Sequence, residues 1–238
     1  MVRVFLLVFG VLALTAQALF AQCRQALVLG LDVSGSVDAR EYRLQIDGLV
    51  QALGSGPVRG ALMTFPDQPV SLLVYEWSGP EDQVVVLPWT DITSEPVLDT
   101  ALAQLQSTTR RDASPGTALG VAMQVGADFL AQRPDCATHT LDISGDGKSN
   151  IGRSPDFARS ALARRGITIN GLVIGADAPA LGDLRQAEIN ELSSYYRSNV
   201  ILGKDAFVET AIGFDDFAAA MQRKLERELR VLVFSDLK

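Results

Sequence analysis

The sequence predicts an α/β fold in which a mostly parallel, six-stranded sheet carries helices on both faces. Apolar strand-like runs alternate with amphipathic helical stretches along the chain, and strands separated by helices are typical of a doubly wound parallel sheet. Two runs instead flank a Ser-Gly-Pro-Glu turn at residues 78–81, which predicts a hairpin and one antiparallel strand. The 238 residues are 47% hydrophobic and 21% charged, so we expect one globular domain over residues 22–238.

The strands are predicted from short apolar runs. The first, residues 26–31, is almost continuously apolar, the pattern of a strand buried on both faces of a parallel sheet. The hairpin supplies the next two strands, and the other three each follow a helical stretch. The six predicted strands are residues 26–31, 70–77, 83–87, 138–143, 167–174 and 207–210.

The helices are predicted from apolar residues at helical spacing. In residues 38–53, Tyr42, Ile46, Leu49 and Leu53 recur every three or four positions. The charges at residues 223–228 alternate in sign, which indicates a solvated helix face. The predicted helices are residues 38–53, 57–62, 95–105, 118–130, 155–164, 184–196 and 214–229.

The first 21 residues predict a secretory signal peptide. Arg3 precedes an apolar run at residues 4–14, which is shorter than the roughly 20 residues that span a bilayer. Small residues at 16–18, Ala-Gln-Ala, match a cleavage site, and Ala21 ends a second candidate. The alternative is an uncleaved anchor, because no charge occurs between residues 4 and 22. Cleavage would give an exported protein, periplasmic or secreted, with no membrane span.

Composition excludes several function classes. Lys and Arg number 21 against 28 Asp and Glu, and the formal net charge of −7 repels nucleic-acid phosphates. The single histidine, His139, excludes sites that need two histidines, and its place in a predicted strand favours a core role. The chain contains no Gly-x-Ser-x-Gly elbow, P-loop or Gly-x-Gly-x-x-Gly motif. These observations predict no nucleic-acid partner and none of the enzyme classes that use those motifs.

Short oxygen-bearing side chains occur in three predicted loops. Asp32, Ser34 and Ser36 alternate directly after the first strand, Thr117 precedes the helix at 118–130, and Asp146 follows the strand at 138–143. Carboxylates and hydroxyls without Cys or His suit a hard cation such as Mg²⁺. For the first loop alone, a simple helix N-cap is the alternative.

Together, Asp-x-Ser-x-Ser, the Gly-Thr that opens a helix and the Asp-Gly after a strand resemble the metal-ion-dependent adhesion site (MIDAS) of von Willebrand factor A (vWA) domains. The similarity covers residues 24–229, and segments at 76–79, 88–89, 195–208 and 224–225 resemble an uncharacterised group of exported proteobacterial vWA proteins. The resemblance implies that Ser34 and Ser36 bind Mg²⁺ or Mn²⁺ directly and that Thr117 binds it directly or through water. Asp32 and Asp146 would act mainly through water.

The resemblance also implies a function. An open position on the ion would capture an Asp or Glu carboxylate of a partner protein, so we expect an exported binding module and not an enzyme. The alternative is a cell-envelope scaffold in which the metal only stabilises the domain. A phosphotransferase with Asp32 as nucleophile would need a second Asp as acid and base, and that position is Ser34.

The two cysteines, Cys23 and Cys136, suggest one disulfide in an exported protein, with two buried free thiols as the alternative. The strand order that the resemblance implies places the strands after Cys23 and Cys136 side by side and parallel. Neighbouring strands are about 4.8 Å apart, and a disulfide joins Cα atoms roughly 4.4–6.8 Å apart. We therefore expect a Cys23–Cys136 bridge at the edge of the sheet opposite the metal loops.

Overall fold

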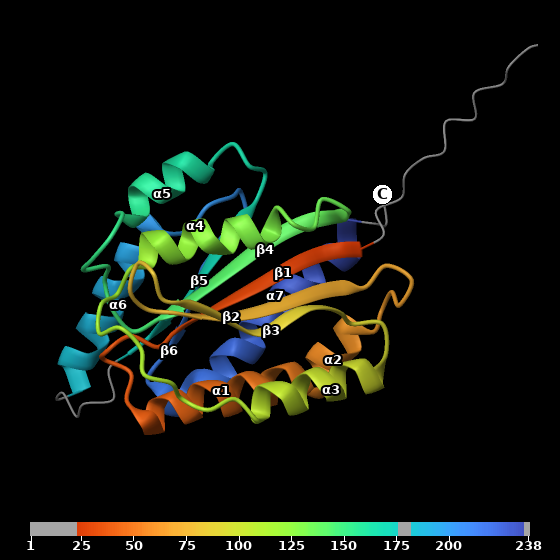
Figure 1. Cartoon of the computed structure of the whole chain (residues 1–238), viewed down its shortest axis with the longest axis horizontal. Helices are drawn as coiled ribbons and strands as arrows, with labels where there is room; N and C mark the ends of the chain where they lie inside the picture. Colours follow the sequence, from red (N-terminus) through yellow and green to blue (C-terminus); the bar gives the residue numbers. More distant parts are fainter. Residues whose placement is uncertain (1–22, 176–181, 236–238) are drawn as a thin grey trace, which may run out of the picture.

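The computed structural model describes residues 23–175 and 182–235, and the predicted signal peptide at residues 1–21 lies outside the described residues. Its sheet has six strands in the order β3-β2-β1-β4-β5-β6 (Figure 1). The antiparallel pair is β2 with β3, and the other four pairings are parallel. The predicted fold class is confirmed. The strands are β1 (Cys23–Asp32), β2 (Val70–Trp77), β3 (Gln83–Asp91), β4 (Cys136–Gly145), β5 (Thr168–Ile174) and β6 (Val208–Ala211).

Helices cover both faces of the sheet (Figure 1). One face packs against α1 (Ala39–Gly54), α2 (Gly56–Leu62), α3 (Glu95–Gln106) and α7 (Phe217–Ser235), which follows a 3₁₀ turn, η1 (Phe214–Asp216). The other face packs against α4 (Leu119–Leu130), α5 (Pro155–Leu162) and α6 (Gly182–Asn199). Within residues 23–175 and 182–235, no helix has the length and apolar character needed to cross a membrane.

The central strand β1 separates two hydrophobic cores. All ten of its residues are buried. Because successive side chains of a strand point to opposite faces, Leu27, Leu29 and Leu31 pack in the core with α1 and α7. Val28 and Ala26 pack in the core with α4 and α5. Two-sided burial explains the nearly continuous apolar run from which the strand was predicted.

The first helix begins at a well-defined cap. Asp38 accepts a hydrogen bond from the Glu41 backbone N–H (2.8 Å), and the Asp38 backbone N–H donates to Glu41 Oε2 (2.8 Å). This capping box satisfies backbone donors that a helix N-terminus otherwise leaves free, a contribution of about 1 kcal/mol. It ends the loop between β1 and α1 only six residues after the strand, so the Asp32–Ser36 segment has a defined position.

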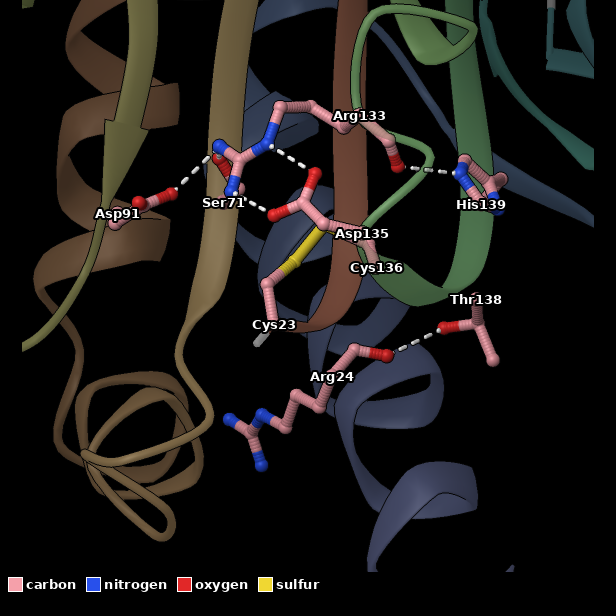
Figure 2. Close-up of a disulfide and its surroundings, with 9 residues drawn as sticks. All are labelled: Cys23, Arg24, Ser71, Asp91, Arg133, Asp135, Cys136, Thr138 and His139. Carbon is pink, nitrogen blue, oxygen red and sulfur yellow. Dashed lines mark hydrogen bonds and ion pairs between the residues drawn. A yellow bond between two sulfur atoms is a disulfide. The ribbon is translucent and has the colours of Figure 1, made fainter. Parts of the chain in front are cut away.

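Cys23 and Cys136 form the predicted disulfide (Figure 2). They are directly opposite each other in the β1–β4 register, with Cα atoms 4.4 Å apart. Both are buried, at the first residue of each strand. Asp135 lies close to the two sulfurs. The sulfurs are bonded to each other, so this group is not a metal site.

Arg133 connects three strands beside the disulfide (Figure 2). Its guanidinium forms ion pairs with Asp91 (2.7 Å) and Asp135 (3.0 Å) and a hydrogen bond with Ser71 Oγ. Its backbone oxygen lies 2.8 Å from Nε2 of His139, which is half-buried on β4. His139 therefore has a hydrogen-bond partner, but it is half-buried and lies outside both hydrophobic cores, so the core position expected for it is wrong.

The prediction of a solvated charged face at residues 223–228 is wrong for two of its residues. Lys224 is completely buried and Glu228 is only 6% exposed. The Lys224 ammonium donates to Glu228 Oε1 (2.8 Å) and pairs with Asp142, which is buried on β4. The alternating charge pattern of a helix contains no information about a carboxylate on a distant strand, so these two burials could not be predicted from it.

Candidate metal centre

The five predicted ligands lie together at the carboxyl edge of the sheet. Thr117 Oγ1 donates to Ser34 Oγ (3.3 Å), the hydroxyls of Ser34 and Ser36 are 3.5 Å apart, and Ser36 Oγ donates to Asp146 Oδ1 (2.8 Å). Asp32 joins this cluster through its Oδ1, which accepts from the Ser34 backbone N–H (2.8 Å). Parallel strands β1 and β4 are adjacent, so the loops that leave their ends meet at this edge.

The loop after β1 is held in place by its backbone. Gln45 Nε2 on α1 donates to the backbone oxygen of Asp32 (3.0 Å). The Gly35 N–H donates to the Pro115 oxygen (3.3 Å), which connects this loop to the loop that carries Thr117. A Cβ at Gly35 would lie 3.0 Å from the Pro115 Cα, so a glycine allows the two loops to approach each other.

Asn150 positions Thr117, and sequence reasoning missed this role. Asn150 Oδ1 accepts a hydrogen bond from the Thr117 backbone N–H (2.9 Å), and the backbone N–H of Asn150 donates to the backbone oxygen of Thr117 (3.0 Å). The Ser149 hydroxyl also donates to that oxygen (3.2 Å). A usable signal exists, because Asn150 follows Asp146 by four residues in the same loop and an amide side chain can both donate and accept.

A buried ionic network anchors the loop before Thr117. Glu76, 1% exposed at the end of β2, accepts from Tyr42 Oη (2.6 Å) and from Arg111 Nε (3.1 Å). Arg111 also pairs with Asp82 in the hairpin turn, and Asp82 Oδ2 accepts from the Ser114 backbone N–H (2.7 Å). Because these contacts join α1, the hairpin and residues 110–117, they fix the approach of Thr117 to the cluster.

The cluster has an excess of negative charge. Asp32 is 1% exposed, and its Oδ2 has no hydrogen-bond partner among the residues that the structure describes. Burial and the nearby Asp146 raise the pKa of Asp32 to about 7, and burial also raises the pKa of Asp146. In the described part of the chain, no Lys or Arg forms an ion pair with either carboxylate. An oxygen-only donor set with an unpaired buried carboxylate fits a divalent cation.

Gly145 and Tyr196 enclose the inner side of the cluster. A Cβ at Gly145 would lie 2.5 Å from the Tyr196 hydroxyl and 3.1 Å from Asp32 Oδ2, so only glycine leaves room for both groups. Tyr196 is fully buried on α6, and burial together with Asp32 and Asp146 raises its pKa well above the usual range. Its role could not be predicted from a tyrosine in a helix of ordinary pattern.

The outer side of the cluster faces solvent. Ser36 is exposed and Asp146 is half-buried, whereas Asp32, Ser34 and Thr117 are buried. Ile151, 47% exposed, lies beside this side, with its Cγ2 only 2.7 Å from a Cβ placed on Gly116. A cation held by the cluster would therefore be reached from one direction, past Ser36 and Asp146.

The doubly wound sheet with an Asp-x-Ser-x-Ser loop, a threonine loop and an aspartate loop at its carboxyl edge is the fold and loop arrangement of vWA domains. The chain belongs to the family described as "Protein of unknown function (DUF1194)", whose model matches residues 22–233. Among curated proteins, none matches this chain.

Solved structures of low sequence identity share the fold. Proximal thread matrix protein 1 (PTMP1) from the mussel byssus, with a zinc-occupied MIDAS motif, has a TM-score of 0.58 and 17% identity over 88% of this chain and 48% of its own. The pilus adhesin SpaC from Lactobacillus rhamnosus GG has a TM-score of 0.56 and 12% identity over 89% of this chain and 31% of its own. A von Willebrand factor type A protein from Catenulispora acidiphila has a TM-score of 0.53 and 14% identity over 87% of this chain and 42% of its own. This chain spans less than half of each.

The raised pKa of Asp32 predicts pH-dependent metal binding. A cation competes with the Asp32 proton, so affinity for Mg²⁺ should rise about tenfold per pH unit below the pKa of about 7 and level off above it. In chelator, stability should fall as the pH rises from 3.8 towards 7, because the folded chain retains a proton that the unfolded chain releases. Calorimetric titration across this range, with denaturant unfolding in chelator, measures both effects. Affinity that stays constant across the range would contradict the prediction.

Proposed function

We propose that this protein is an exported, metal-dependent binding module in which a bound Mg²⁺ or Mn²⁺ captures an Asp or Glu carboxylate of a partner protein. The observation that carries the proposal is the oxygen-only cluster: Oδ2 of the inner carboxylate, Asp32, has no hydrogen-bond partner among the described residues, and the outer side, at Ser36 and Asp146, is open. The zinc-occupied MIDAS of PTMP1 supports a divalent ion in a site of this type.

The residues have distinct proposed roles. Ser34 and Ser36 hold the cation directly and Thr117 directly or through water, while Asp32 and Asp146 orient hydroxyls and water molecules. Neutral hydroxyl ligands leave most of the positive charge on the cation, which can then attract an anionic group from the open side. The pilus adhesin SpaC supports a binding role for this type of domain. Catalysis is not part of the proposal, because Ser34 stands where an aspartyl phosphotransferase needs its acid and base.

Two features support export. Residues 1–21 have the pattern of a cleaved signal peptide, and the chain carries a disulfide. Disulfides persist in oxidising compartments such as the periplasm or the extracellular space and are rare in the cytosol. We therefore place the mature protein in the periplasm or outside the cell.

Partner capture is expected to need the cation and Asp146. Immobilised mature protein incubated with the exported fraction in Mg²⁺ should retain a partner that chelator releases, and Asp146→Ala should lose it because the outer ligand set is incomplete. Asp67→Ala is the matched control, since Asp67 is an exposed aspartate in the turn before β2, at the opposite edge. Circular dichroism checks folding of both variants. Equal retention in excess chelator would instead favour the cell-envelope scaffold.

A further inference from the structure

A second polar site lies between the sheet and the end of α7. It is a cavity of about 380 Å³, and its lining includes Gln25 on β1, Thr140 on β4, Asn170 on β5 and Glu228 on α7. Gln25 and Asp32 are seven residues apart on one strand, so the cavity is roughly 23 Å from the metal centre. A volume of this size is within the range of sites that hold small organic ligands.

The inner wall of the cavity offers hydrogen-bond acceptors. Gln25 Nε2 already donates to Thr140 Oγ1 (2.9 Å), and Asn170 Nδ2 donates to Glu228 Oε1 (2.5 Å). The other oxygens of two of these side chains, Gln25 Oε1 and Glu228 Oε2, are buried and have no hydrogen-bond partner in the described part of the chain. Gln25 is 2% and Glu228 6% exposed. Buried acceptors of this kind are costly unless a donor reaches them.

The carboxylates behind this wall outnumber the cations. Two buried acidic groups, Asp142 and Glu228, share the single ammonium of Lys224. Burial and the neighbouring Glu228 raise the pKa of Asp142 well above its usual range, so one carboxyl group of this cluster holds a proton when no further cation is near. A ligand that brings a positive, donating group would take the place of that proton and supply the missing donors.

The mouth of the cavity has the opposite character. Lys204 and Arg227 line it and are exposed, together with the exposed Asp205. The Arg227 guanidinium lies 3.8 Å from the ring centroid of Phe207, which fixes its position at the rim. The cavity thus combines an acceptor-rich, negative interior with a net positive rim.

We propose that this cavity binds a small zwitterionic ligand of the free amino-acid class. Its ammonium group donates to Gln25 Oε1 and Glu228 Oε2 once these side chains turn towards the cavity, because both oxygens are buried in the structure, and its carboxylate lies towards Lys204 and Arg227. This site is independent of the metal centre, so ligand binding does not require a divalent cation.

The test uses calorimetry and thermal shift on the mature protein in chelator, with free α-amino acids as probes, pooled and then singly. At least one amino acid should bind at or below about 10 mM. Its N-trimethyl derivative, which keeps both charges but has no N–H donor, should not. Failure of every amino acid, or equal binding of the trimethyl derivative, would overturn the proposal. A failed metal titration leaves this result unaffected, because chelator is present throughout.

Two variants locate the site. Glu228→Gln should weaken binding about tenfold or more, because a charged acceptor is lost, whereas Glu226→Gln, on the same helix but outside the cavity lining, should not. If Glu228→Gln does not fold, the exposed Arg227→Gln replaces it and should weaken binding about two- to fivefold, with Arg223→Gln as its control. Unchanged affinity in the variants of the lining would show that the amino acid binds elsewhere and would overturn the proposal.

Discussion

Loss of the Cys23–Cys136 disulfide is expected to lower the free energy of unfolding by about 4–5 kcal/mol. The bridge closes a loop with a sequence separation of 113 residues, so it removes much of the conformational freedom of the unfolded chain. It also fixes the first residue of β1 to β4, and the end of a strand is otherwise the part that frays most easily. Urea unfolding of the wild type, with and without reductant, measures the effect.

The Cys23→Ala/Cys136→Ala double variant supplies the control for this experiment. Reductant should leave its stability unchanged, and the metal affinity of the reduced wild type should stay close to that of the oxidised protein, because the bridge and the metal centre occupy opposite edges. Mass spectrometry of a non-reduced digest tests the bridge itself. Two free thiols in protein purified from the periplasm, or equal stability of both redox forms, would contradict the prediction.

Combined replacement of Ser34 and Ser36 by alanine is expected to abolish binding of Mg²⁺ or Mn²⁺. The wild type should bind one ion with an affinity of roughly micromolar to millimolar, as expected for a small oxygen site. Removal of the two proposed direct ligands leaves one hydroxyl and two carboxylates, which are proposed to act mainly through water and are too few to hold the ion. Calorimetry on chelator-treated protein measures the loss.

Ser107→Ala is the matched control for the metal experiment. Ser107 is exposed at the end of α3, and its hydroxyl donates only to the backbone oxygen of Gln104 (2.7 Å). This variant should bind the ion as the wild type does, and circular dichroism should show that both variants fold. Unchanged binding in the Ser34→Ala/Ser36→Ala protein would place the metal elsewhere.

The spacing of apolar residues predicted the strands and helices, because the side chains that each element buries in the two cores recur at the period of that element. Strand ends were less predictable. β1 and β4 begin at the disulfide and continue beyond their apolar runs, to Asp32 and Gly145, because their lengths are set by pairing with neighbouring strands. β3 continues through Pro88 to Asp91, which an edge strand tolerates since a proline there loses no ladder hydrogen bond.

The candidate metal ligands could be proposed from sequence because each lies in a short polar loop directly beside a strand or helix. Their supporting residues could not. Glu76, Arg111 and Tyr196 come from segments of ordinary composition, and only the folded topology brings them to the site. For the same reason the burial of Lys224 could not be predicted, because its partner Asp142 is on another element. Local patterns predict positions within an element, while ion pairs between elements depend on tertiary structure.

The central strand has a mechanical consequence. β1 leads into the metal loops at Asp32 and begins at Cys23, with hydrogen-bonded parallel neighbours on both sides. Tension between a partner held at the metal centre and an attachment at the amino-terminal end of β1 would run along the axis of β1. Such a load shears the two hydrogen-bond ladders all at once, which resists force better than opening them one bond at a time. The covalent link at Cys23 would also transfer part of the load to β4. The strand that leads into the proposed binding site, β1, is therefore also the strand best placed to withstand pulling.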